Sequence, residues 1–230
     1  MLKKILIATD LSESSFSLIE CLKELKVLGV ETAVLTHVID LKYATLVPQQ
    51  IIDESMEMLA KQAEILTDTG ITVITDLKLG IPHTEILNTA NTNSVSAIIV
   101  GSHGKSVAKE ILLGSVTSQL IEEANLPMLI IKMSLLQTTT KVRYCSVKMT
   151  NLFKNILFPT DFSEENKAAI NFLSAMKEYL EKITIIHVQE PIMLEQPVEF
   201  DIQELDAIDL KRLEDIEKIF KPQVKTSKEV

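Results

Sequence analysis

The chain has 230 residues, of which 46% are hydrophobic and 24% are charged, so it can bury a sizeable core. Its net charge of −9 argues against a nucleic-acid backbone as a partner. The two cysteines, Cys21 and Cys145, indicate neither a disulfide framework nor a metal site. The sequence has no apolar run long enough to cross a membrane and no signal-peptide pattern, so it predicts a soluble cytoplasmic protein without membrane contact.

Short apolar segments alternate with helical patterns in the first part of the chain. Strands are predicted at 4–8, 32–39, 71–77, 97–100 and 127–131. Helices are predicted over 13–25, after Pro48, after Pro82 and after Gly114. Ser12 is placed to cap the first helix, and Cys21 falls on its apolar side, where we expect it to be buried. Strands separated by helices imply right-handed crossovers and a parallel sheet.

A glycine pattern follows the fourth predicted strand, in the sequence GSHGKSVAKEILLGSVT. Gly101 and Gly104 allow a sharp turn with no side chain between backbone and ligand, and Gly114 and Ser115 follow after nine intervening residues. The helix that starts there would offer free N–H groups to an anion. The pattern predicts a phosphate site, although this spacing also suits an ordinary turn and helix cap. His103 lies in the loop, where it contacts phosphate or is simply solvated.

With Gly101, Gly104, Gly114 and Ser115 in this pattern, the chain resembles the ATP-binding branch of the universal stress protein family. The resemblance covers residues 3–132 as a whole domain and 154–220 in part, which is typical of a tandem member with an incomplete second domain. The resemblance implies an α/β fold with a doubly wound, parallel, five-stranded sheet in the order 3-2-1-4-5, of the adenine nucleotide alpha-hydrolase-like type. It also implies that the protein binds ATP or AMP, with Mg²⁺ a possible companion of ATP, and forms a homodimer through its fifth strand. We therefore expect a regulatory or stress-response role, with an unknown downstream protein partner.

The resemblance also assigns individual residues to the nucleotide site. Asp10 ends the first strand, where it would contact ribose or a metal near the phosphates, unless it serves only an Asx turn or helix cap beside Ser12. Val38 would recognise the adenine edge through its backbone, or would simply pack in the core. Ala8 stands where family members often have proline. The predicted nucleotide-binding residues are Ala8, Thr9, Asp10, Val38, Val100, Gly101, His103, Gly104, Gly114, Ser115, Val116 and Thr117, with no catalytic residue and no metal site assigned.

The beginning of the chain returns in its second half. The segment KILIATDLSE at 4–13 matches NILFPTDFSE at 155–164, and LTHV at 35–38 matches IIHV at 185–188. One such match could arise from shared turn chemistry, but two in the same order favour a duplication.

The repeat predicts the domain organisation. We expect a complete domain at 1–132, a linker at 133–153 and a truncated second copy at 154–230. No glycine follows Gly114, so only the first domain is expected to hold a nucleotide. The truncated copy lacks a fourth strand, which would leave the sheet edge at 156–158 unpaired. We expect this edge to be covered either by dimerisation or by the segment 133–151.

Binding is better supported than catalysis. The sequence has no Ser-His-Asp order, no Cys-His pair and no metal-ligand cluster, and it lacks the Walker and dinucleotide fingerprints. His37 and His187 are expected to pack or hydrogen-bond at strand ends. We therefore predict a nucleotide-binding protein; the alternatives are a slow ATPase and a structural or interaction module that uses no nucleotide.

Overall fold

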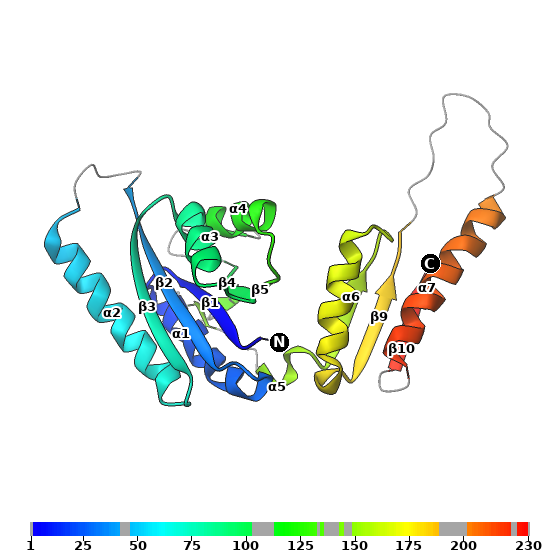
Figure 1. Ribbon diagram of the computed structural model, residues 1–230, viewed down its shortest axis with the longest axis horizontal. Helices are drawn as coiled ribbons and strands as arrows, with labels where there is room; N and C mark the ends of the chain where they lie inside the picture. The colour runs from blue at the N-terminus through cyan, green and yellow to red at the C-terminus, as the bar shows by residue number, and fades with distance from the viewer. Residues whose placement is uncertain are drawn as a thin grey trace, which may run out of the picture. The chain divides into compact units, whose positions relative to one another are not determined.

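The computed structural model describes residues 2–41, 47–102, 113–132, 134–135, 143–144, 149–188, 202–221 and 225–229. The chain forms two compact units, Met1–Met149 and Thr150–Val230, and each is described by itself (Figure 1). The predicted site residues His103 and Gly104 lie outside the described residues.

The first unit is built on one parallel sheet with the strand order β3-β2-β1-β4-β5, which confirms the predicted fold. Its strands are β1 (Lys4–Thr9), β2 (Thr32–Asp40), β3 (Thr72–Gly80), β4 (Ala97–Gly101) and β5 (Met128–Ile131). β1 is central: Ile5, Leu6 and Ile7 are almost completely buried and pair with β2 on one side and β4 on the other. The winding of the sheet therefore reverses between β1 and β4.

Helices cover both faces of this sheet. They are α1 (Glu13–Cys21), the 3-10 helix η1 (Leu22–Leu28), α2 (Gln49–Thr67), α3 (Pro82–Thr92) and α4 (Ser115–Glu123). α3 and α4 share one face, where Ile86 and Leu120 join Leu6, Val34 and Ile98 in a buried cluster. α1 and α2 contact each other, and right-handed crossovers place them on the opposite face (Figure 1).

The first helix differs from its prediction. A single helix is predicted over 13–25, whereas α1 ends at Cys21 and η1 continues the chain. Leu22, Leu25 and Leu28 are all buried and lie three residues apart, and a 3-10 helix with three residues per turn places such residues on one face. Cys21 was expected to be buried and is only half-buried, because it lies where the buried face changes direction.

Short elements lie within the segment predicted as a linker. They are β6 (Ser134–Leu135), β7 (Arg143–Tyr144) and α5 (Met149–Leu152). β6 and β7 pair with each other in antiparallel fashion, and β7 contacts α1. The described part of this segment therefore includes an extended strand pair that belongs to the first unit.

The second unit contains a parallel three-stranded sheet with the order β10-β9-β8. Its elements are β8 (Asn155–Pro159), α6 (Glu165–Ala175), the 3-10 helix η3 (Lys177–Tyr179), β9 (Lys182–Ile186), α7 (Ile202–Phe220) and β10 (Lys225–Glu229). The sequence does not predict β10, because KTSKE offers no apolar pattern. Among the described strands β8 pairs only with β9, and Leu157 on it is 65% exposed.

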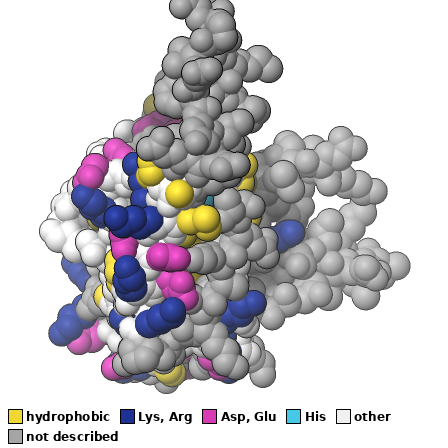
Figure 2. All heavy atoms as spheres, turned by 90° about the vertical axis from the view of Figure 1, so that its right-hand side faces the viewer, with side chains coloured by type: hydrophobic (Ala, Val, Ile, Leu, Met, Phe, Trp, Pro, Cys, Tyr) yellow, Lys and Arg dark blue, Asp and Glu magenta, His cyan; other side chains and the backbone are white. Residues whose placement is uncertain are grey.

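α7 carries charged side chains of both signs on its exposed side. Its ion pairs, three or four residues apart, are Arg212–Asp209, Lys218–Asp215 and Lys221–Glu217. Figure 2, which looks at the side where α7 lies in Figure 1, shows basic and acidic side chains intermixed around a few hydrophobic ones. Exposed pairs of this kind contribute little to stability. Among the described helices, none combines the length and the apolar composition needed to cross a bilayer.

Candidate functional site

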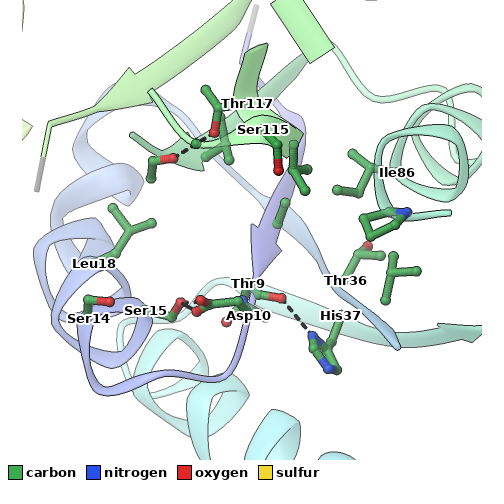
Figure 3. Close-up of a pocket in the computed structure, with 17 residues that line it drawn as sticks. Thr9, Asp10, Ser14, Ser15, Leu18, Thr36, His37, Ile86, Ser115 and Thr117 are labelled. Atoms are coloured by element: carbon green, nitrogen blue, oxygen red, sulfur yellow. Dashed lines mark hydrogen bonds between the residues drawn. The ribbon is translucent and has the colours of Figure 1, made fainter. Parts of the chain in front are cut away.

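A pocket of about 300 Å³ opens at the C-terminal ends of β1, β2 and β4, beside the first turns of α1, α3 and α4 (Figure 3). It is lined by Ala8, Thr9, Asp10, Ser14, Ser15, Leu18, Thr36, His37, Val38, Pro82, Ile86, Val100, Gly101, Gly114, Ser115, Val116 and Thr117. The pocket lies where the winding of the sheet reverses, which is where open α/β sheets bind their ligands. Its volume suits a small molecule.

The pocket brings together every predicted site residue that the structure describes. These residues are Ala8, Thr9, Asp10, Val38, Val100, Gly101, Gly114, Ser115, Val116 and Thr117. They meet because β1 and β4 are neighbouring parallel strands whose C-terminal ends lie at one edge of the sheet. The placement of His103 and Gly104 remains a prediction.

Part of the pocket wall was missed by sequence reasoning. α1 contributes Ser14, Ser15 and Leu18, β2 contributes Thr36 and His37, and α3 contributes Pro82 and Ile86. The residues of α1 could have been predicted to line the pocket, because that helix starts shortly after Asp10. The residues of α3 had none, because the spacing of apolar residues does not say how closely a helix approaches the strand ends.

Asp10 is held by the first turn of α1. Its Oδ1 accepts hydrogen bonds from the backbone N–H of Ser12 at 3.1 Å, from the Ser12 hydroxyl at 2.6 Å and from the Ser15 hydroxyl. Ser12 in turn caps the helix by accepting from the N–H of Ser15 at 3.2 Å. The Asx turn that the sequence left open as an alternative is therefore present. It does not take Asp10 out of the pocket; it fixes the direction of the carboxylate at the pocket wall.

The turn between Asp10 and α1 depends on an unusual backbone conformation. Leu11 has a φ of 58°, in the left-handed region, and is only 4% exposed. Its N–H donates to the hydroxyl of Thr9 at 3.1 Å. The chain can therefore turn sharply at the end of β1 while the side chain of Leu11 stays in the core.

His37 fastens the end of β2 to the end of β1. Its Nδ1 lies 2.9 Å from the carbonyl oxygen of Thr9 (Figure 3). This contact confirms the expected hydrogen bond at a strand end. The imidazole thereby forms part of the pocket wall and keeps the two strand ends together.

The N-terminus of α4 faces the pocket. Gly114 is the N-cap, and the first N–H groups of a helix have no acceptor within the helix. The N–H of Gly114 donates to the carbonyl of Ser102 at 2.8 Å, and the hydroxyl of Thr117 donates to the carbonyl of Gly101 at 3.0 Å. The start of α4 is thus tied to the end of β4. The positive end of the helix dipole at this point favours an anion.

The described lining of the pocket contains few titratable side chains. Asp10 and His37 are the titratable side chains that line it, so a bound anion would be held by backbone dipoles rather than by lysine or arginine from the described lining. In the described part of the chain, no three histidine, cysteine or acidic side chains gather as a metal site.

The second unit repeats the turn after its first strand. The N–H of Phe162 donates to the hydroxyl of Thr160 at 3.1 Å, the N–H of Ser163 donates to Oδ1 of Asp161 at 3.0 Å, and Nδ1 of His187 lies 2.7 Å from the carbonyl of Thr160. Phe162 also has a positive φ, of 61°. Hydrogen bonds from the side chain and then the backbone of Ser163 lower the pKa of Asp161 below its ordinary value.

Side chains gather over this second turn. The rings of Phe162 and His187 have centroids 4.3 Å apart, and the guanidinium of Arg212 lies 5.4 Å from the centre of the Phe162 ring. Nε2 of His187 lies 3.4 Å from a carboxylate oxygen of Asp209. Residues of α7 therefore contact the region that corresponds to the pocket edge in the first unit.

Two kinds of comparison relate the sequence to known proteins. The model of the universal stress protein family matches residues 1–132. Universal stress protein MJ0577 of Methanocaldococcus jannaschii is 34% identical over 155 residues, which cover 57% of this chain and 96% of that protein. Universal stress protein YxiE of Bacillus subtilis is 30% identical over 148 residues, which cover 57% of this chain and 100% of that protein.

Solved structures agree with the fold. The structure of hypothetical protein MJ0577 matches with a TM-score of 0.53 and 37% identity, over 58% of this chain and 98% of that one. The crystal structure of a universal stress protein from Archaeoglobus fulgidus matches with a TM-score of 0.66 and 27% identity, over 99% of this chain and 77% of that one. The second match therefore extends over both units.

Proposed function

This chain belongs to the universal stress protein family, whose model matches residues 1–132 of its 230, and on that premise we propose that its first unit binds an adenine nucleotide, ATP or AMP. One observation carries the proposal. A single pocket of about 300 Å³ gathers the end of β1 at Asp10, the end of β2 at Val38 and the N-terminus of α4 at the reversal point of the sheet.

Each part of the pocket suits one part of a nucleotide. The first turn of α4, which follows Gly114 at the pocket wall, would hold phosphate oxygens. Asp10 is a carboxylate of fixed direction and would accept from ribose hydroxyls. The base would lie against Ala8, Val38 and Ile86, which form an apolar wall. His103 and Gly104 are expected to complete the phosphate end.

Mg²⁺ would enter only with ATP. Mg²⁺ at nucleotide sites is held by one or two carboxylates together with phosphate oxygens and water. Asp10 is the carboxylate among the described lining residues, so it would be the protein ligand while the phosphates supply the rest.

The second unit would be a truncated copy without a nucleotide site. Support comes from the recurrence of the hydrogen bonds of Thr9 and Asp10 at Thr160 and Asp161, and from the match of a universal stress protein structure over 99% of the chain. We propose a regulatory, stress-related role in which the nucleotide state of the first unit is passed to a protein partner, with the chain acting as a homodimer.

The direct test is to find the nucleotide. Protein purified without added nucleotide is denatured, and the supernatant is analysed for adenine absorbance and for the number of phosphates. Stripped protein is then titrated with AMP and ATP by calorimetry. A stoichiometric adenine nucleotide, or saturable binding of one per chain, supports the proposal. If the purified protein contains no nucleotide and the stripped protein binds none, the chain is an interaction module that uses no nucleotide. Release of phosphate from bound ATP over hours would instead identify a slow ATPase.

A further inference from the structure

Thr36 is a polar residue in an otherwise hydrocarbon part of the pocket. It lies on β2 between Ala8 of β1 and Asp76 of β3, and it is 1% exposed. Its Oγ1 has no hydrogen-bond partner among the residues that the structure describes. A buried hydroxyl without a partner costs stability, so its presence calls for an explanation.

No described residue forms a hydrogen bond with this hydroxyl, and the carboxylate of Asp76, opposite Thr36 on β3, accepts instead from the hydroxyl of Thr89 at 2.9 Å. Figure 3 shows Thr36 beside Ile86 at one end of the pocket, with Leu18 and Ser14 at the other end. The neighbouring lining residues Val38, Pro82 and Ile86 have only hydrocarbon side chains. The backbone groups of β2 at this point take part in pairing with β1 and β3.

Four other hydroxyls around the pocket, those of Thr9, Ser14, Ser15 and Thr117, differ from Thr36 because they form hydrogen bonds within the protein. Thr9 accepts from the N–H of Leu11, Thr117 donates to the carbonyl of Gly101, and Ser14 and Ser15 belong to the hydroxyl cluster around Ser12 and Asp10. These groups build the pocket. Thr36 has no such structural bond, which leaves its hydroxyl available to a ligand.

Thr36 lines the pocket, and rotation of its side chain can change which of its groups is directed toward the pocket. Its Oγ1 has less than 1 Å² of accessible surface in the empty pocket. Rotation about the Cα–Cβ bond exchanges the hydroxyl with the methyl group, which has nearly the same size. Since Oγ1 has no partner among the described residues, this rotation breaks no hydrogen bond with them.

We propose that the Thr36 hydroxyl hydrogen-bonds a polar edge atom of the nucleobase and is a specificity-determining residue of the nucleotide site. The inference rests on the proposed function. The base is the matching group, because flat apolar walls with one well-placed polar atom are typical of sites that orient an aromatic ligand. The phosphates belong at the N-terminus of α4, which lies apart from Thr36 in Figure 3. A hydroxyl can donate or accept, so it can pair with either kind of atom on a purine edge.

The test compares Thr36→Val with wild type in both stability and binding. Valine keeps the shape and removes the hydroxyl, so the ligand-free variant should melt at the same temperature as wild type or higher. Its affinity for AMP should fall about three- to tenfold, the effect of one lost hydrogen bond. Its affinity for ribose 5-phosphate, which has the sugar and the anion but no base, should not change. Thr36→Ser keeps the hydroxyl and should keep the ratio of the two affinities.

A matched control comes from Thr89 on α3. Thr89 is 2% exposed, and its hydroxyl donates to a carboxylate oxygen of Asp76 at 2.9 Å. Thr89→Val removes a partnered hydroxyl outside the pocket, so it should lower the melting temperature without changing the relative affinities for AMP and ribose 5-phosphate.

The outcomes separate two kinds of failure. If wild type binds AMP and Thr36→Val binds it equally well, this inference is wrong while the proposed function stands. If Thr36→Val melts lower, as Thr89→Val should, and its preference for AMP over ribose 5-phosphate is unchanged, the hydroxyl is structural. If wild type binds no AMP, the proposed function fails and this inference fails with it.

Discussion

The hydroxyl of Thr117 donates a 3.0 Å hydrogen bond to the carbonyl oxygen of Gly101, which ties the first turn of α4 to the last residue of β4. The N–H of Gly114 adds a second tie, to Ser102 at 2.8 Å. The N-cap of α4 is therefore held in place from both sides. We therefore expect a side chain added at Gly114, which lines the pocket, to occupy part of the pocket.

Gly114→Val should therefore abolish nucleotide binding while the fold is retained. Gly114 has a φ of −71° and a ψ of 156°, which valine adopts readily, and replacing glycine, an acceptable N-cap residue, by valine, a poor one, should cost about 1 kcal/mol. AMP affinity is measured by calorimetry and stability by thermal melting. Ala124→Val, at the C-cap of the same helix, is the control and should bind normally. Unchanged affinity in Gly114→Val would place the ligand elsewhere.

Asp10→Ala should affect both stability and binding, whereas Asp161→Ala should affect stability alone. Each carboxylate accepts from the N–H two residues later, at 3.1 and 3.0 Å, so each variant loses the hydrogen bonds of its turn and should melt at a lower temperature. Only Asp10 lines the described pocket. Binding isotherms and denaturant melts of both variants give the comparison. Equal loss of AMP affinity in the two variants would show that the effect of Asp10 is indirect.

The pH dependence of stability should reveal the hydrogen bonds of Asp161. Its pKa is lowered in the folded protein by Ser163, so its contribution is complete above the pKa of the unfolded chain and is lost as pH falls through the folded pKa. The stability difference between wild type and Asp161→Asn should thus be largest near neutral pH and should disappear in acid. Denaturant melts from pH 7 to pH 3 measure it. Ser163→Ala, which removes the side-chain donor, should reduce the same difference; a difference that grows in acid contradicts this account.

The chain is expected to sediment as a homodimer through the free edge of β5. β5 and β8 are both edge strands of the described sheets, and Leu157 on β8 is exposed. Leu157→Lys places a charge on β8 and should leave the dimer intact, because charges block pairing only at the edge that carries them. Sedimentation velocity at low protein concentration measures the state. A monomeric Leu157→Lys would assign the dimer to β8, and a well-folded monomeric wild type would exclude the predicted homodimer.

The sheet could be predicted from the sequence because its central strands are buried on both faces. Residues such as Ile5, Leu6, Ile98 and Ile99 form continuous apolar runs, and the helices between them imply the parallel order. The strand order then brings Asp10 and Gly101 together without further information. The part of the site that depends on strand ends was therefore predictable.

The other features of the fold and of the pocket depend on tertiary contacts, which produce no recognisable pattern in the sequence. Pro82 and Ile86 line the pocket because of where α3 packs, and the hydroxyl of Thr36 can be recognised as lacking a partner among the described residues only once its neighbours are known. β10 was missed because its residues are polar and pairing with β9, rather than burial, defines it. The 3-10 turn through Leu22, Leu25 and Leu28 was hidden because those leucines also fit the end of an α-helix.

The left-handed residue Leu11 has a consequence for the energetics of recognition. A non-glycine residue in this conformation costs about 1–2 kcal/mol, a cost that the burial of its side chain offsets during folding. The carboxylate of Asp10 is consequently locked before a ligand arrives. Ligand binding should then restrict few additional degrees of freedom on this side of the pocket. The conformational entropy lost on binding should therefore come from the ligand and from the opposite wall of the pocket.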